Sequence, residues 1–359
     1  MTRMIVPLTP VHCLVCAATL LNVAPLAAAE VPAAPTAPPA ERSLVEPSWL
    51  RRLVVDGKHN AFTALVRWQD QVWLAFRKGT DHGSTDGNIT LLRSADAETW
   101  TEALSLDILA DDRDAQLLAT PDRLLLYSLS WTENRQRLQS CVSYTEDGDA
   151  WSDPQPVYEP GYFLWKPTAH AGRFYAGAHR KGSMNERGVN LIAADDGIAW
   201  QKVSTIRAGQ GESETTLLFG SEGRLTAFVR NMMDLKGSIR EASPPYAEWT
   251  ERTAGHHLSG HSVHEFNGVT YLISRHLDDR ARAASSIGGL SAGTMIFTYE
   301  DGQLRPYCLL PGRHDCSYAG AVQVSDQMLV SYYSSHEYPD WVEKNGPADI
   351  YLAWVPLKK

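Results

Sequence analysis

The chain has 359 residues, of which 43% are apolar, and a formal net charge of −9. Such a chain is long enough for one large β domain or two average domains with packed cores. The acidic net charge argues against nucleic acid as the main partner, because a surface that binds phosphates needs an excess of basic residues.

The first 29 residues have the features of a secretory signal peptide. Arg3 precedes the apolar stretch VHCLVCAATLLNVAPL, and residues 27–29 (AAA) form a small-residue cleavage site. The apolar run is too short for a membrane span, so we expect a secreted or periplasmic protein that does not cross a membrane. Acylation of Cys16, which would make a lipoprotein, is the alternative.

Residues 30–42, EVPAAPTAPPAER, form a Pro/Ala-rich linker that has no means of building a core. The folded domain is therefore expected at residues 43–359. It contains Cys141, Cys308 and Cys316, and an odd number of cysteines excludes a framework built mainly on disulfides. Cys308 and Cys316 flank a short loop and could pair, but buried thiols are an equally good interpretation.

Four segments share a polar turn that closes on a tryptophan: RSADAETWTE, YTEDGDAWSD, AADDGIAWQK and ASPPYAEWTE. Their tryptophans, at positions 100, 151, 200 and 249, are separated by 51, 49 and 49 residues. A fixed period near fifty with several short strands per unit is typical of a β-propeller. We expect Asp96, Asp147 and Asp196 to accept backbone hydrogen bonds in their turns and the tryptophans to pack between blades, which are structural roles.

A hairpin precedes each tryptophan motif, and six such hairpins can be found, with central turns at positions 70, 122, 172, 222, 267 and 326. Six third strands follow them: NITLLRS, RLQSCVSY, GVNLIAAD, KGSIREAS, GTMIFTYE and ADIYLAWV. The predicted fold is therefore an all-β, six-bladed propeller with four strands per blade. The early strand LRRLVVDG is expected to complete the last blade and close the ring.

Aligning the six hairpins on their turns brings chemically active residues to one end of the blades. The first strands begin with the His59–Phe62 region, Asp114, the Trp165–Lys166 region, Glu214, the His261–Ser262 region and Tyr318. The second strands end at Arg77 or Lys78, Ser130, Arg180, Arg230, Arg275 and Ser334. A ring of guanidinium groups suits carboxylate or sulfate, because the planar fork binds these anions bidentately. Alternatively, each arginine pairs with a local carboxylate and stabilises its blade.

The segment ESETTLLFGSEGRLTAFVR resembles the sialidase superfamily of six-bladed propellers with Asp-box repeats, in which a Glu precedes an Arg by sixteen residues. The resemblance covers residues 43–359. It implies that Arg230 and Arg275 bind the substrate carboxylate, that Glu214 activates the nucleophile, and that Tyr318 in SYAGAVQV is that nucleophile. In the loop KGTDHGSTDG, where the family places its acid, Asp86 is the better candidate and Asp81 the second.

The implied chemistry explains these residue types. Sialic acid carries a carboxylate on its anomeric carbon, which would repel a carboxylate nucleophile. A tyrosine is neutral until a base such as Glu214 removes its proton, and tyrosine nucleophiles are a known exception among glycosidases. The arginines would hold the substrate anion and also lower the free-energy cost of a phenolate.

The sequence departs from the family at the start of the first blade, where HNAFTAL lacks the expected arginine. Arg77, with Glu337 as its partner, is the candidate to reach the same space. His82, His179, His276 and His336 also belong to the polar ring and leave room for a different acid–base scheme.

Three functions are open at this point. The first is a retaining sialidase-like exo-glycosidase that acts on a terminal sialic acid or a related anionic sugar, with Tyr318, Glu214 and Asp86 as catalytic residues and Arg230, Arg275, Arg77, Arg180 and Glu337 lining the substrate site. The second is a propeller lyase or hydrolase for uronate-containing polysaccharides. The third is a binding protein for acidic glycans without catalysis. No metal motif is present, and we expect a monomer without a cofactor.

Overall fold

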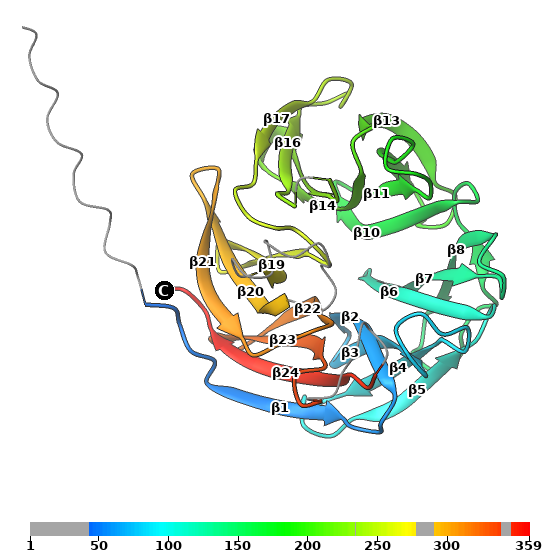
Figure 1. The fold of residues 1–359 in the computed structure, drawn as a ribbon, viewed down its shortest axis with the longest axis vertical. Helices are drawn as coiled ribbons and strands as arrows, with labels where there is room; N and C mark the ends of the chain where they lie inside the picture. The colour runs from blue at the N-terminus through cyan, green and yellow to red at the C-terminus, as the bar shows by residue number, and fades with distance from the viewer. Residues whose placement is uncertain (1–42, 234, 278–290, 339–345) are drawn as a thin grey trace, which may run out of the picture. The chain divides into compact units, whose positions relative to one another are not determined.

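The computed structural model describes residues 43–233, 235–277, 291–338 and 346–359, and the predicted signal peptide and linker lie outside them. The segment Ser43–Lys359 forms one compact unit. Its described strands form six four-stranded antiparallel sheets arranged around a centre, as Figure 1 shows. The fold is therefore the predicted all-β, six-bladed propeller.

Each of the first three blades runs from an inner strand at the centre to an outer strand at the rim. Blade one contains β2 (His59–Trp68), β3 (Gln71–Gly79), β4 (Asn88–Ser94) and β5 (Thr101–Leu106). Blade two contains β6 (Asp111–Ala119), β7 (Leu124–Trp131), β8 (Leu138–Thr145) and β9 (Gln155–Pro156). Blade three contains β10 (Tyr162–His170), β11 (Arg173–Arg180), β12 (Gly188–Ala194) and β13 (Gln201–Ala208).

The other three blades repeat this order. Blade four contains β14 (Glu212–Phe219), β15 (Leu225–Asn231), β16 (Ser238–Ala242) and β17 (Thr250–Thr253). Blade five contains β18 (Ser262–Phe266), β19 (Val269–Leu277), β20 (Ser291–Glu300) and β21 (Gln303–Leu310). Blade six contains β22 (Cys316–Val324), β23 (Gln327–Ser334), β24 (Asp349–Pro356) and, as its outer strand, β1 (Trp49–Val54).

The ring is closed by the pairing of β1 with β24, as the sequence predicts. The register aligns Trp49 with Trp354, and their rings pack at a tilt with centroids 4.4 Å apart. A parallel bridge between His59 and Ala348 joins blade one to blade six on the inner side. Because β1 pairs with β24, the outer edge of this sheet is formed by a contact between segments far apart in the sequence.

The tryptophan-motif turns have the structural role that their sequence indicates. The Asp147 Oδ1 accepts hydrogen bonds from the backbone of Asp149 and Ala150 at 2.9 and 2.8 Å. Trp151 from this turn of blade two meets Trp73 of blade one edge to face, with centroids 6.4 Å apart. Similar turn hydrogen bonds are made by Asp96 and Asp196. These residues therefore tie the turns and help to pack neighbouring blades.

The apolar core lies between the blades, where buried strand residues of adjacent sheets meet. Cys141 and Cys308 are buried thiols outside any disulfide, so the pairing of Cys308 with Cys316 is not formed. None of the described segments is a helix long and apolar enough to cross a bilayer.

A β-bulge interrupts the inner strand of five blades at equivalent places. The register shifts fall at Ala61/Ala64, Arg113/Gln116, Trp165/Thr168, Glu212/Thr215 and Ser317/Gly320. Phe62, Asp114 and Tyr318 have positive φ angles of 58°, 53° and 51° at these bulges. A bulge adds a residue and redirects its side chain, and bulges are common beside active sites. The repeated bulge therefore marks the end of the ring where the blades present their polar side chains.

Candidate active site

Tyr318 and Glu214 form the centre of the candidate site. The Tyr318 hydroxyl, from β22 of blade six, donates a hydrogen bond of 2.7 Å to Oε1 of Glu214, from β14 of blade four. Only 8% of Tyr318 and 7% of Glu214 are exposed. The contact joins blades that are not neighbours, so it forms only because both inner strands face the centre of the ring.

The surroundings of Glu214 favour its ionised form. Burial alone would raise the pKa of this carboxyl, but the charge of Arg230 and hydrogen bonds from Gly260 and Tyr318 lower it to about 2. The Arg230 Nη1 lies 2.6 Å from Oε1, and the backbone N–H of Gly260 donates to Oε2 at 2.6 Å. Glu214 is therefore a hydrogen-bond acceptor for the Tyr318 hydroxyl at neutral pH.

The phenol of Tyr318 is neutral at rest. Burial and the negative charge of Glu214 raise its pKa, whereas Arg230 and Arg275 act in the opposite direction. A free phenolate is therefore too costly to accumulate, and the proton must leave as the oxygen attacks. The acceptor for that proton, Glu214, is already in hydrogen-bond contact.

The ring of Tyr318 is held between other aromatic side chains. Its centroid lies 4.9 Å from that of Phe62 and 5.5 Å from that of Trp165, both in edge-to-face geometry. On another side, a Cβ built on Gly260 would lie only 2.6 Å from Cγ of Tyr318. Gly260 also has a positive φ of 57°. Only glycine therefore lets this backbone approach the tyrosine and donate to Glu214.

Arg230 has donors left for a ligand. Its Nη1 is used by Glu214, but its Nε is buried without a hydrogen-bond partner within the described part of the chain. The side chain is 12% exposed. A guanidinium that is fixed by one carboxylate and keeps unused N–H groups is suited to grip an anion of a substrate.

Arg275, the other arginine implied by the resemblance, is occupied by the protein itself. Its Nη2 donates to Oδ1 of Asp315 at 2.9 Å, and its Nε donates to the carbonyl of Cys316 at 3.0 Å. Only 3% of the residue is exposed. Its guanidinium carbon lies 5.4 Å from the centroid of the Tyr318 ring. Arg275 therefore lies beside the tyrosine, but an internal carboxylate already neutralises it.

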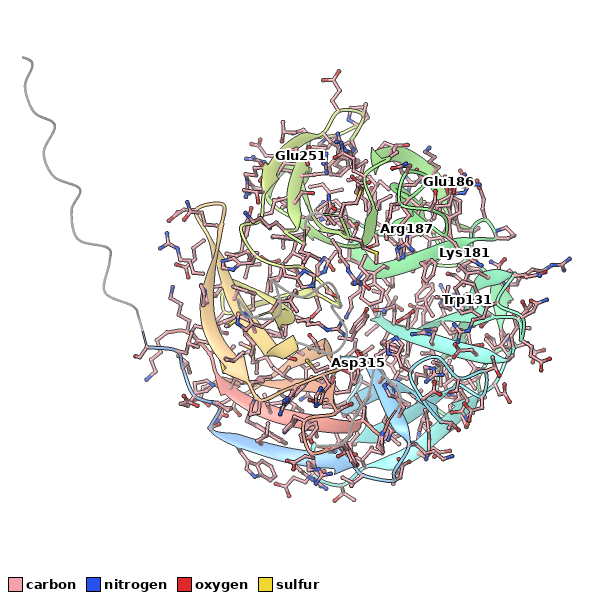
Figure 2. All side chains as sticks on the ribbon, in the orientation of Figure 1. Trp131, Lys181, Glu186, Arg187, Glu251 and Asp315 are labelled. Carbon is pink, nitrogen blue, oxygen red and sulfur yellow. The ribbon has the colours of Figure 1, made fainter. Side chains whose placement is uncertain are left out.

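Asp315 is the shared acceptor of a buried network. Besides Arg275, it contacts His82 Nδ1 and accepts a hydrogen bond of 2.9 Å from the Tyr333 hydroxyl, and His59 Nε2 lies 3.2 Å from its Oδ2. Burial alone would raise the pKa of Asp315, but the two histidines and Arg275 hold it well below its usual range. Figure 2 places Asp315 toward the middle of the ring.

His59, His82 and Asp315 are also the described side chains best placed to hold a metal ion, since their ligand atoms lie within 4.8 Å of one another. Two arginines touch this cluster, however. Arg275 binds the carboxylate, and Arg113 Nη2 lies 3.4 Å from Nε2 of His82. The negative charge of Asp315 is thus already compensated, which fits a hydrogen-bond network better than a cation site.

Arg77 supports the loop between β3 and β4 and does not face the tyrosine. Its Nε lies 2.8 Å from Oδ1 of Asp111, and its other nitrogens donate to the carbonyls of Asp81 and Ser84 at 2.9 and 3.0 Å. The side chain is fully buried. Its carboxylate partner is Asp111 rather than the expected Glu337, which is half-exposed, 3.6 Å from Nε2 of His336.

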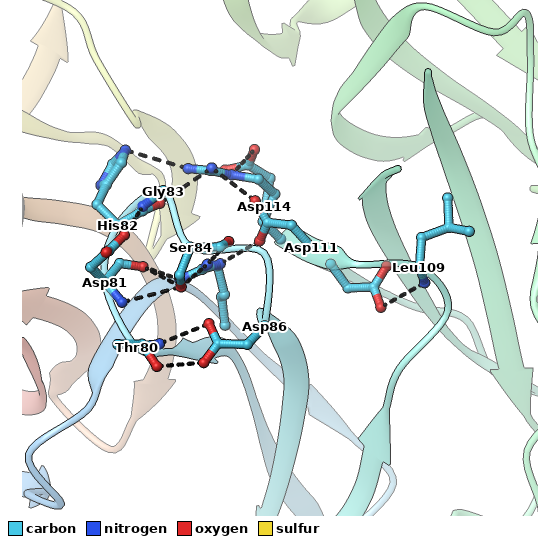
Figure 3. Close-up of polar contacts among 12 residues, drawn as sticks. Thr80, Asp81, His82, Gly83, Ser84, Asp86, Leu109, Asp111 and Asp114 are labelled. Carbon is cyan, nitrogen blue, oxygen red and sulfur yellow. Dashed lines mark hydrogen bonds and ion pairs between the residues drawn. The ribbon is translucent and has the colours of Figure 1, made fainter. Parts of the chain in front are cut away.

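Asp86 and Asp81 are used inside the same loop (Figure 3). Asp86 is exposed and accepts hydrogen bonds from the backbone and the hydroxyl of Thr80. Burial alone would raise the pKa of Asp86, but hydrogen bonds from Ser84 and Thr80 together outweigh this and lower the pKa. Asp81 Oδ1 caps the backbone N–H of Gly83 at 2.7 Å. No hydrogen bond of the described residues joins either aspartate to Tyr318 or Glu214.

Of the predicted residues, the structure brings together Tyr318, Glu214 and Arg230, with Arg275 against the tyrosine ring. Arg180 lies exposed at the end of β11. Sequence reasoning gave no role to two residues near the centre, Arg113 and Lys166. Lys166 Nζ donates to the carbonyl of Ala319 at 3.1 Å, and burial lowers its pKa to about 8 against the opposing charge of Glu214.

No family model and no curated protein sequence matches this chain. Among solved structures, the phage phi92 endosialidase is similar with a TM-score of 0.66 and 9% identity, over 86% of this chain and 69% of the other. Trypanosoma rangeli sialidase, in complex with the inhibitor DANA, has a TM-score of 0.65 and 12% identity, over 87% of this chain and 57% of the other. Penicillium chrysogenum alpha-L-arabinanase has a TM-score of 0.60 and 12% identity, over 82% and 93%.

At these identities the similarity concerns the fold, and this chain spans little more than half of the trypanosomal chain. The function has to be argued from the side chains. The fold itself is that of the sialidase-like β-propellers.

Proposed function

We propose that this protein is a retaining glycosidase that removes a terminal acidic sugar, sialic acid or a relative of it, from a glycan. The contact of Tyr318 with Glu214, which Arg230 holds in its ionised form, is the observation that carries the proposal. This arrangement couples a neutral nucleophile to a base and places a cation beside both. A carboxylate nucleophile would be repelled by an acidic sugar, whereas a tyrosine is not.

The proposed reaction has two steps. In the first, the Tyr318 oxygen bonds to the anomeric carbon while its proton passes to Glu214, and the leaving sugar departs with a proton from an acid. In the second, a water molecule attacks the same carbon and gives a proton back to that group. The bond to Tyr318 breaks as the water oxygen bonds to the carbon, and the tyrosine recovers its proton from Glu214.

The structural neighbours support this choice of chemistry. Trypanosoma rangeli sialidase is described in complex with sialic acid, and with 2,3-difluorosialic acid as a covalent intermediate. These ligands are acidic sugars, and a covalent intermediate is what a retaining mechanism requires.

The decisive experiment is turnover of a fluorogenic sialoside by the purified protein, with Tyr318→Phe as the matched variant. We expect turnover by the wild type and a loss of about 10³-fold or more in the variant, because it lacks the nucleophilic oxygen but keeps the ring. Wild-type protein that turns over no sialoside and no other acidic glycoside would reject the proposal.

A second candidate is cleavage of uronate-containing polysaccharides. Two observations favour it: blade one has no arginine at its bulge, and Arg275 is occupied by Asp315. A site with fewer available arginines suits a sugar whose carboxylate is farther from the anomeric carbon. Ultraviolet absorbance from an unsaturated uronate product would identify a lyase, and a glycan that binds without any product would identify a binding protein.

We also propose that the chain is exported and acts as a monomer. The export proposal depends on the signal-peptide features of residues 1–29. N-terminal sequencing of the protein from the culture medium or periplasm would test the cleavage site, and light scattering would test the oligomeric state.

A further inference from the structure

We propose that two consecutive residues of blade two, Arg113 and Asp114, complete the site: Arg113 binds the substrate anion and Asp114 protonates the leaving sugar. They would replace the arginine and the acid that the resemblance places in blade one. The inference rests on the proposed glycosidase function and assigns the two roles that function still lacks.

Arg113 lies next to the bulge of blade two and faces the bulge residue of blade one. Phe62 occupies the bulge of blade one, at the place where the resemblance leads one to expect an arginine. Arg113 reaches across from β6, and its guanidinium carbon lies 4.6 Å from the centroid of the Phe62 ring. The same ring contacts Tyr318. The Phe62 ring therefore contacts both the guanidinium of Arg113, from the neighbouring blade, and the proposed nucleophile Tyr318.

The contacts of Arg113 leave it able to take a ligand. Its shortest polar contact with the described residues, to the carbonyl of His82, is 3.3 Å, and its distances to carboxylate oxygens of Asp111 and Asp114 are 3.4 and 3.6 Å. These are long for charge-assisted hydrogen bonds, which are normally below about 2.9 Å. The side chain is 11% exposed. Stacking on Phe62 holds the guanidinium in place while its donors stay weakly engaged.

Asp114 is placed to act as the acid. It sits at the bulge itself, with positive φ, and 14% of its side chain is exposed. Burial raises the pKa of its carboxyl to about 6, the charge of Arg113 opposes this, and the charge of Glu214 adds to it. The site thus contains one carboxyl with a raised pKa and one, Glu214, with a lowered pKa. Such a division is typical of an acid and a base in one active site. Figure 3 shows Asp114 beside Asp111, at the opposite end of this network from Asp86.

With these roles the proton balance closes. The proton of Asp114 goes to the glycosidic oxygen as its bond to the anomeric carbon breaks and the bond to Tyr318 forms. In the second step, the carboxylate of Asp114 takes a proton from the attacking water. Each turnover therefore returns Asp114 to its protonated form.

The acid is tested with Asp114→Asn and two substrates that differ only in the leaving group. For a sugar leaving group, which needs protonation, we expect kcat/KM to fall about 10²–10⁴-fold. A nitrophenol leaves without being protonated, so kcat/KM for this substrate should be nearly unchanged. Added azide should accelerate release of the sugar from the enzyme. We expect the wild-type rate to fall above about pH 6, as Asp114 loses its proton, and this fall should be absent in Asp114→Asn. Equal losses for both leaving groups would overturn the assignment.

The cation is tested with Arg113→Gln, measured on an acidic glycoside. We expect KM to rise about 10–100-fold, because charge-assisted hydrogen bonds to the substrate are lost, and Arg113→Lys should recover part of this. Arg135→Gln is the matched control: Arg135, in the loop between β7 and β8, also contacts Asp111, at 2.6 Å. If Arg135→Gln reproduces the KM change, Arg113 acts only through Asp111 and the assignment is wrong.

Failure of this inference and failure of the proposed function give different results. Calorimetry measures the binding of free sialic acid and of glucuronate to the wild type and to Tyr318→Phe, and circular dichroism checks the folding of every variant. A wild type that neither binds nor cleaves acidic sugars contradicts the proposed function. An active wild type whose Asp114 and Arg113 variants fold and keep normal kinetics contradicts only the inference.

Discussion

Blades one and two have inner hairpins of the same design, with a bulge at the same register, yet they contribute to the site in opposite ways. Blade one places the apolar Phe62 at its bulge and buries Arg77. Blade two places Asp114 at its bulge and extends Arg113 over the Phe62 ring. Equivalent backbone positions therefore do not carry equivalent chemistry.

The two arginines differ in how far their donors are satisfied. Arg77 makes its hydrogen bonds at 2.8–3.2 Å to Asp111 and to the loop that follows β3. Among the residues that the structure describes, Arg113 has no polar contact shorter than 3.3 Å. A saturated, fully buried guanidinium has nothing left to offer a ligand, whereas a weakly engaged one has. The comparison suggests that saturation, rather than residue type, separates structural arginines from functional ones.

The largest expected effect tests the structural side of this comparison. Arg77→Gln should lower the free energy of unfolding by about 3 kcal/mol, because Asp111 loses its fully buried partner, although Arg113 and Arg135 still face it, and the loop carbonyls lose their donors. Arg113→Gln should change it much less, since no short hydrogen bond is lost. Denaturant unfolding of both variants measures the difference. Equal destabilisation would mean that both arginines are structural.

A smaller effect concerns Asp114 and depends on pH. The pKa of its carboxyl is raised to about 6 in the folded state. The contribution of Asp114 to the free energy of unfolding is therefore fully present below about pH 4. It is lost as pH rises through 6, which lowers the free energy of unfolding by about 2–3 kcal/mol. Asp114→Asn cannot ionise and avoids this cost. The stability of the variant relative to wild type should increase from pH 4 to pH 7, as followed by thermal unfolding. A difference that does not change with pH would contradict the raised pKa.

The smallest effect concerns the ring of Phe62 in blade one, on which Arg113 of blade two stacks. Phe62→Leu keeps the site apolar but removes the ring on which Arg113 stacks. A cation–π contact is worth about 0.5–1 kcal/mol, so KM for an acidic glycoside should rise about two- to five-fold. Val72→Ala, at a buried position near the start of β3 in the same blade, serves as the control for general core loosening. A KM change in the control as large as in Phe62→Leu would remove the special role of the ring.

The sequence pattern was sufficient for most of the fold. The fifty-residue spacing of Trp100, Trp151, Trp200 and Trp249 and the six hairpin turns predicted six blades and the closure by β1, and both are observed. The spacing from Glu214 to Arg230, together with Tyr318, selected the three side chains that meet at the centre. These features are readable because a repeated hairpin fixes which residues face the centre, whatever the other blades do.

Which of the charged residues can bind a ligand depends on contacts that form only in the folded ring. Whether Arg275 is neutralised by Asp315, or whether Arg113 stacks on Phe62, depends on contacts between different blades. The positive φ of Asp114 and the turning of Asp86 into its own loop are likewise invisible in a pattern of residue types. A repeat determines the register of each blade from local sequence, but hydrogen-bond saturation is a property of the assembled ring, because the partners come from segments far apart in the chain.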